Sequence, residues 1–202
     1  MTRSTRPSPV AVLVGQLRPG SPVLVSGGAA IALVAVLTLV QRGDEVPLFL
    51  AHLVALLVAA GAAYLLDDTT AEVTAVVPRP LLQRRLVIVG RGVVMAAVAW
   101  VIVALLLQWR SPSVPLAALT WETAGLLWIG IAASAIASRH GESEPGNLVA
   151  SALGLVVSGV LVAQPLLPFT VLITASDGPV RSAGWATTTC AAVVAFVVAS
   201  RE

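Results

Sequence analysis

The sequence contains few charged side chains and no lysine. Charged residues make up 11% of the 202 residues, and all twelve basic residues are arginine. A soluble domain carries about 25% charged residues, so an ordinary water-soluble globule is excluded. Hydrophobic residues make up 57%, which excludes a disordered chain. These proportions predict an all-α, polytopic membrane protein. Arginine without lysine, in a chain dominated by Ala, Val, Leu, Gly and Pro, is typical of a GC-rich bacterial genome.

Other chemical features are scarce as well. The single cysteine, Cys190, excludes an intramolecular disulfide and a metal site built from several cysteines. A net charge of +2 gives no reason to expect a nucleic-acid partner. The chain has neither Gly-x-Ser-x-Gly nor the phosphate-binding pattern Gly-x4-Gly-Lys-Ser/Thr. We therefore expect no catalytic residues, no metal site, no cofactor and no enzymatic activity in this chain.

Apolar segments of about 20 residues recur along the sequence, and each is long enough to cross a bilayer as a helix. They predict six transmembrane helices in a single transmembrane domain over residues 1–202. The predicted spans cover residues 19–41, 46–66, 88–109, 114–138, 146–167 and 182–200. Two connections are long enough to matter: a loop at 67–87 and an irregular, proline-containing segment at 168–181.

Arginine placement predicts the orientation. Six spans put both termini on one side, and that side would hold nine arginines against three on the other. Because cytoplasmic loops carry the excess of basic residues, both termini and the 67–87 loop are predicted to be cytoplasmic. The expected location is therefore a bacterial plasma membrane. Trp109, Trp121 and Trp185 fall at predicted outer ends, where aromatic side chains favour the membrane interface.

The 67–87 loop contains a helix signal. Thr69 and Glu72 form the capping pattern Ser/Thr-x-x-Glu, and Pro78 and Pro80 stop a helix. We expect a short helix over residues 70–77, with acidic Asp67 and Asp68 ahead of its N-terminus. Its apolar face would be formed by three valines: Val73, Val76 and Val77.

Two roles fit such a helix. It can dock into a groove on a cytoplasmic partner, or it can lie in the lipid interface as an amphipathic linker. Arg84 and Arg85 follow it, and their expected role is to anchor the next span at the membrane surface. They can in addition contact a partner's acidic groove or lipid phosphates.

The same segment resembles a loop of ATP-binding-cassette exporter permeases with six helices and a separate ATPase chain. In that family the loop between helices two and three often reads Thr-Leu-Glu, five further residues, Pro, and an apolar run ending in Gly-Lys or Gly-Arg. Here Thr70, Glu72 and Pro78 match that spacing, and Gly90-Arg91 closes the run. Thr69 departs from the pattern, since the family usually has glycine there. The motif covers about 22 residues, and the six-span layout is also similar.

The resemblance implies a function. In the family this loop forms a coupling helix that passes the movements of the ATPase to the transmembrane helices. The chain would then be a permease subunit, paired with an identical or related permease and with an ATPase that carries Gly-x4-Gly-Lys-Ser/Thr and binds ATP and Mg. The low polarity of the spans favours an apolar or amphipathic substrate, moved by alternating access. The coupling residues would be Thr70, Glu72, Val73, Val76, Val77, Pro78, Arg84 and Arg85.

Two ionisable side chains fall within predicted spans, near their outer ends. Because burying such a group is costly, Glu122 and His52 are candidates for a substrate path or gate. The alternatives are that Glu122 reaches water at the interface and that His52 makes a polar contact between helices. Small residues in span five, Gly154 and Ser158, and Gly130 in span four predict close helix packing.

Other functions stay open on the sequence alone. The chain can be the substrate-capturing membrane subunit of an importer, which needs a polar cup on the outer side. It can also be a structural or assembly subunit without transport activity. A membrane enzyme acting on lipid phosphates needs a compact cluster of acids, His or Ser, and Asp67, Asp68 and Glu72 do not make one.

Overall fold

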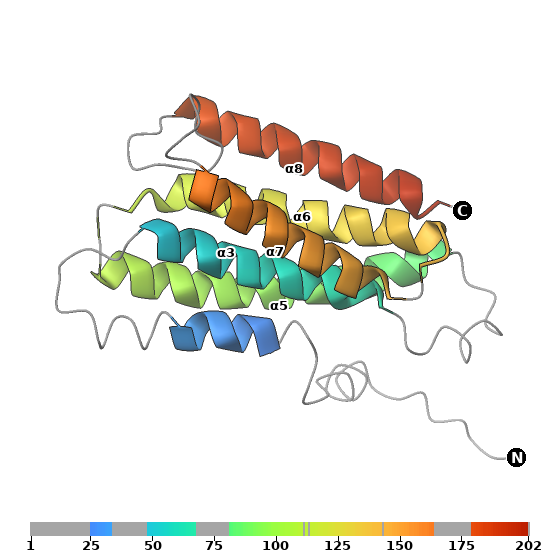
Figure 1. The fold of residues 1–202 in the computed structure, drawn as a ribbon, viewed down its shortest axis with the longest axis horizontal. Coiled ribbons are helices and arrows are strands. Elements are labelled where there is room, and N and C mark those ends of the chain that lie inside the picture. The colour runs from blue at the N-terminus through green and yellow to red at the C-terminus, as the bar shows by residue number, and fades with distance from the viewer. Residues whose placement is uncertain are drawn as a thin grey trace, which may run out of the picture.

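The computed structural model describes a helical protein (Figure 1). The described residues are 25–33, 48–67, 81–110, 112, 114–142, 144–163 and 179–201. Within these ranges every regular element is helical and no strand occurs, so the predicted all-α class is confirmed there. Besides a helix at 25–33, the elements are α3 (Leu48–Ala63), the 3-10 turn η1 (Tyr64–Leu66), α5 (Leu81–Arg110), α6 (Leu116–Arg139), α7 (Pro145–Ala163) and α8 (Pro179–Ala199).

Three of the described helices are long and apolar enough to cross a membrane. The qualifying stretches are Arg85–Trp109 in α5, Leu116–Arg139 in α6 and Ser182–Ala199 in α8. The apolar helices Leu50–Leu66 and Pro145–Val160 are shorter. The described part therefore supports a membrane protein with three candidate spanning helices.

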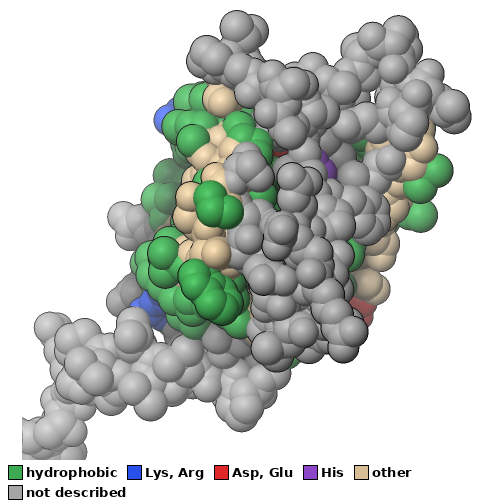
Figure 2. Space-filling model, turned by 90° about the vertical axis from the view of Figure 1, so that its left-hand side faces the viewer, with side chains coloured by type: hydrophobic (Ala, Val, Ile, Leu, Met, Phe, Trp, Pro, Cys, Tyr) green, Lys and Arg blue, Asp and Glu red, His purple; other side chains and the backbone are tan. Residues whose placement is uncertain are grey.

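The outer surface of the described helices is apolar. Figure 2 shows hydrophobic side chains along the flanks of the molecule. Large apolar side chains are exposed on α5, α7 and α8; Leu105 is 66% exposed, Leu155 77% and Val194 61%. Large exposed apolar surfaces are rare on soluble proteins, whereas lipid-facing helices carry them without cost.

The helices lie side by side with their long axes roughly aligned (Figure 1). Helix α6 is central, because it packs against α3, α5, α7 and α8. One end of the bundle carries η1, the start of α5, the end of α6, the start of α7 and the end of α8 (right in Figure 1). We name it the Asp67 end and name the opposite end the His52 end.

Two helices begin earlier than the sequence predicts. Helix α5 starts at Leu81, whereas the sequence predicts a loop that continues to residue 87. Arg84 and Arg85 therefore lie in its first turns. A hydropathy search excludes these charged residues from the span, although arginine is a good helix former. Helix α8 starts at Pro179, inside the segment predicted to be irregular, because proline fits the first position of a helix.

The glycines of α6 and α7 differ in their surroundings. A Cβ added at Gly130 would lie 3.2 Å from the Leu153 side chain and 3.4 Å from the Ala59 carbonyl oxygen, so α3, α6 and α7 approach closely there. The packing predicted at Gly154 is not observed among the described residues. A Cβ there would meet nothing within 4 Å, and Ser158 is exposed. The spacing of small residues does not reveal which helix face is turned inward.

Candidate functional site

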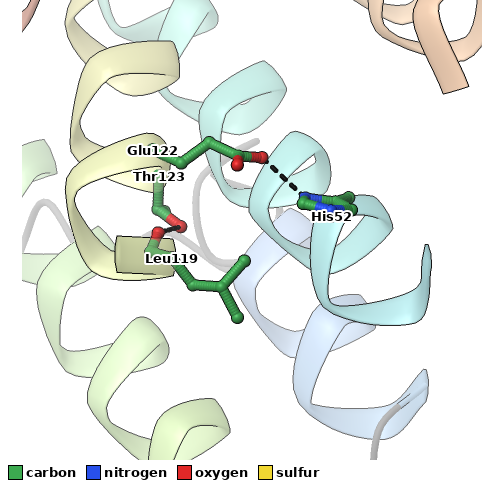
Figure 3. A network of polar contacts seen from close by, with 4 residues as sticks. All are labelled: His52, Leu119, Glu122 and Thr123. Atoms are coloured by element: carbon green, nitrogen blue, oxygen red, sulfur yellow. Dashed lines mark hydrogen bonds and ion pairs between the residues drawn. The ribbon is translucent and has the colours of Figure 1, made fainter. Parts of the chain in front are cut away.

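A buried histidine and a buried glutamate meet between α3 and α6. Nδ1 of His52 lies 2.7 Å from Oε1 of Glu122. His52 is 3% exposed and Glu122 is fully buried. Figure 3 shows the two side chains pointing toward each other from neighbouring helices. The sequence singled out both residues separately, and the fold brings them together across 70 positions of the chain.

Buried apolar residues lie close to this pair in the sequence. Val54 and Ala55 on α3 and Leu119 on α6 are buried next to it in the sequence. The hydroxyl of the neighbouring Thr123 donates to the Leu119 carbonyl at 2.7 Å, within its own helix (Figure 3). The Thr123 hydroxyl is therefore hydrogen-bonded within α6. The His52–Glu122 contact, in contrast, joins α3 to α6.

The burial of Glu122 argues against the alternative that this residue reaches water at the interface. A glutamate at the membrane interface would extend toward water, whereas this carboxylate is enclosed by the protein and faces an imidazole. In a low-dielectric interior the His52–Glu122 contact fixes the register of α3 against α6, since separating the two side chains would break a buried hydrogen bond.

The Asp67 end carries a second set of polar contacts. Oδ1 of Asp67, just after η1, accepts a hydrogen bond from the Gly146 amide in the first turn of α7 at 2.6 Å. Nearby, the Tyr64 hydroxyl donates to Oδ1 of Asn147 at 3.4 Å. Desolvation raises the pKa of Asp67 above its ordinary value; the Gly146 hydrogen bond opposes this shift, and the charge of Glu144 adds to it.

Asp67 therefore has a contact that the sequence does not predict. The sequence places it ahead of a helix at 70–77, as a negative charge near that N-terminus. The predicted helix lies outside the described residues. In the described part, the Asp67 carboxylate accepts from the start of α7, where amide groups lack partners within their own helix. No local pattern could reveal this, because the two residues are 79 positions apart.

Arg85 connects three helices at the same end. Its guanidinium on α5 donates to the Ser138 hydroxyl on α6 and to the Ala199 carbonyl at the end of α8, the latter at 3.5 Å. Ser134, one turn earlier on α6, donates to the Ala63 carbonyl at 2.9 Å. The sequence predicts a surface anchor at Arg85; within the fold this residue is half-buried and bonded to two other helices.

The predicted coupling residues divide into two groups. Thr70, Glu72, Val73, Val76, Val77 and Pro78 lie outside the described residues. Arg84 lies in the first turns of α5, beside Arg85. Asp67 and Leu81, the described residues nearest the predicted coupling segment, both lie at the Asp67 end of the bundle (Figure 1).

Comparison of the chain with known protein families, with curated proteins and with solved structures finds no match. In the described ranges, no three His, Cys, Asp or Glu side chains are grouped so that they could hold a metal ion. Function is therefore inferred from the residues themselves.

Proposed function

We propose that the chain is the transmembrane permease subunit of an ATP-binding-cassette exporter. It would have six spans and both termini in the cytoplasm of a bacterial cell. The observation that carries the proposal is the sequence Thr70-x-Glu72 with Pro78 at the family's spacing. The described elements on either side of this motif, η1 and the start of α5, lie at the Asp67 end of the bundle.

Charge placement in the described part agrees with that orientation. Arg85, Arg91, Arg139 and Arg201 belong to the segments that meet at the Asp67 end. An excess of arginine is the mark of the cytoplasmic side. In this proposal the Asp67 end faces the cytoplasm, where a separate ATPase that binds ATP and Mg can reach residues 70–77.

The cargo in this proposal is apolar or amphipathic. The described surfaces of α5, α7 and α8 are apolar, and the buried His52–Glu122 pair is a polar feature inside the bundle near the His52 end. A path for a hydrophilic solute needs many polar side chains, whereas an apolar substrate can move along helix surfaces. A second permease, identical or related, would complete that path.

Cysteine labelling tests the six-span orientation. In a Cys190→Ala chain, single cysteines at Gly43 and Ser113 are expected to react with a membrane-impermeant maleimide in intact cells. Cysteines at Thr70 and Ser143 should react only after permeabilisation, because they belong to cytoplasmic loops. Labelling of position 70 or 143 in intact cells, at the rate seen for position 43, would contradict the orientation.

The coupling role is tested by the double variant Glu72→Ala with Val76→Asp. The first change removes the capping carboxylate, and the second puts a charge on the apolar face that would dock into the ATPase. We expect the variant to insert normally and to lose at least tenfold of the ATPase activity that co-purifies with the chain. Thr187→Val, which removes an exposed hydroxyl on α8 bonded within its own helix, is the control and should retain full activity. Unchanged ATPase activity in the double variant would exclude coupling through this segment.

A further inference from the structure

Both flanks of residues 68–80 are bonded to other helices. On one side, Asp67 accepts from the Gly146 amide at the start of α7 at 2.6 Å. On the other side, Arg85 donates to Ser138 near the end of α6 and to the Ala199 carbonyl at the end of α8. Together these contacts join the segment's flanks to α6, α7 and α8.

The Asp67 contact is made directly to the backbone of α7, at a point where α7 lies very close to residues 63 and 64. Its donor is a backbone amide, so no rotatable side chain lies between the carboxylate and the α7 backbone. A Cβ added at Gly146 would lie 2.7 Å from Cα of Tyr64 and 2.9 Å from the Ala63 carbonyl oxygen. The backbones of η1 and α7 therefore touch, so a displacement of η1 toward α7 presses directly on the start of that helix.

The Arg85 contact is suited to the helix ends it meets. The last carbonyl groups of a helix lack partners within the helix and carry partial negative charge, so a cation is stabilised there. The planar guanidinium can donate in two directions at once, to Ser138 and to the Ala199 carbonyl. A displacement of the first turns of α5 is thereby passed to α6 and α8 together.

Helix α6 leads from this contact to the buried pair. Ser138 and Glu122 are 16 residues apart on one uninterrupted helix, a separation of about 24 Å at 1.5 Å per residue. The helix that Arg85 holds at the Asp67 end thus carries Glu122 against His52 near the other end.

We infer that Asp67 and Arg85 are positioning residues that transmit displacement of residues 68–80 to α7 and to α6 with α8. This inference rests on the proposed function, in which a partner ATPase moves that segment. It adds two defined links, Asp67 to Gly146 and Arg85 to Ser138 and Ala199, and it assigns α6 as the element that conveys the movement toward the His52 end.

Hydrogen–deuterium exchange of the chain purified with its ATPase tests these links. Exchange is measured without nucleotide and with ATP plus vanadate. In the wild type, trapping is expected to change exchange in residues 68–80, 134–139 and 145–150. In Asp67→Ala the change at 145–150 should be lost, and in Arg85→Gln the change at 134–139 should be lost. Both variants should keep the change at 68–80.

Conservative variants separate transmission from simple destabilisation. Asp67→Asn keeps a side-chain oxygen that can accept from Gly146, so it should restore the nucleotide-dependent change at 145–150. Ser138→Ala keeps Arg85 but removes its acceptor on α6, and it should behave like Arg85→Gln. The matched control is Thr120→Val, which removes a hydroxyl bonded to Trp100 Nε1 at 3.1 Å between the same helices, α5 and α6, near the His52 end. It should preserve all three changes.

The outcomes are distinguishable. If trapping alters residues 68–80 and the distant changes persist in Asp67→Ala and Arg85→Gln, the inference is overturned while the proposed function stands. If trapping alters nothing at residues 68–80 in the wild type, the proposed function fails, and the inference fails with it.

Discussion

Replacing Glu122 with alanine is expected to lower the free energy of unfolding by about 3 kcal/mol, because it leaves a buried imidazole without its carboxylate partner. The two side chains belong to residues that are 3% and 0% exposed, so water cannot replace the lost contact without entering the bundle. The measurement is equilibrium unfolding of the purified chain in detergent, followed by circular dichroism.

Two further variants identify the cause of that loss. Glu122→Gln keeps the size of the side chain and a hydrogen-bonding group, so it should cost less than about 1 kcal/mol. The double change His52→Leu with Glu122→Leu removes both polar groups and should cost less than Glu122→Ala alone, because a buried ion pair is often replaceable by apolar side chains. Equal losses for the alanine and glutamine variants would show that the contact does not hold α3 against α6.

Replacing Gly146 with alanine is the second change with a large expected effect, a loss of about 2 kcal/mol. The new methyl group would lie within 3.0 Å of two backbone atoms of residues 63 and 64 and of the Asp67 carboxylate. Backbone atoms cannot rotate away, so α7 would have to move from η1, and the Asp67–Gly146 hydrogen bond would stretch.

The same substitution elsewhere in α7 provides the control. A methyl group added at Gly154 would meet no atom within 4 Å, so Gly154→Ala causes no steric conflict. It should raise the free energy of unfolding by up to about 1 kcal/mol, because alanine favours the helix more than glycine does. If both alanine variants changed stability equally, the close approach of η1 and α7 would be wrong.

Composition and charge predict the helical class and the apolar segments, because both depend on properties summed over many residues. Local signals also identify Glu122 and His52 as unusual, since an ionisable side chain stands out in an apolar helix. Their pairing could not be predicted, because hydropathy gives no information on which faces of α3 and α6 meet. The sequence gives one hint of the pairing: His52 and Glu122 both lie near the predicted outer ends of their spans, at a similar depth in the membrane.

The contacts at the Asp67 end are a second case in which the local sequence does not predict a tertiary contact. Asp67 has a complete local explanation as a charge ahead of a predicted helix, yet its carboxylate accepts from Gly146 on α7. Arg85 has a complete explanation as a surface anchor, yet it bonds to α6 and α8. For both residues, a role within the local sequence already explains the side chain, so the sequence gives no reason to expect a contact with a distant helix. Only the packing of the helices reveals that contact.

The most direct test of the central claim is purification of the tagged chain from its native membrane in mild detergent, with mass spectrometry of the proteins that remain bound. We expect a stoichiometric partner that carries Gly-x4-Gly-Lys-Ser/Thr and whose ATPase activity falls when Glu72→Ala and Val76→Asp are introduced. A chain that purifies alone, or with partners that lack this motif, would contradict its assignment as an exporter permease.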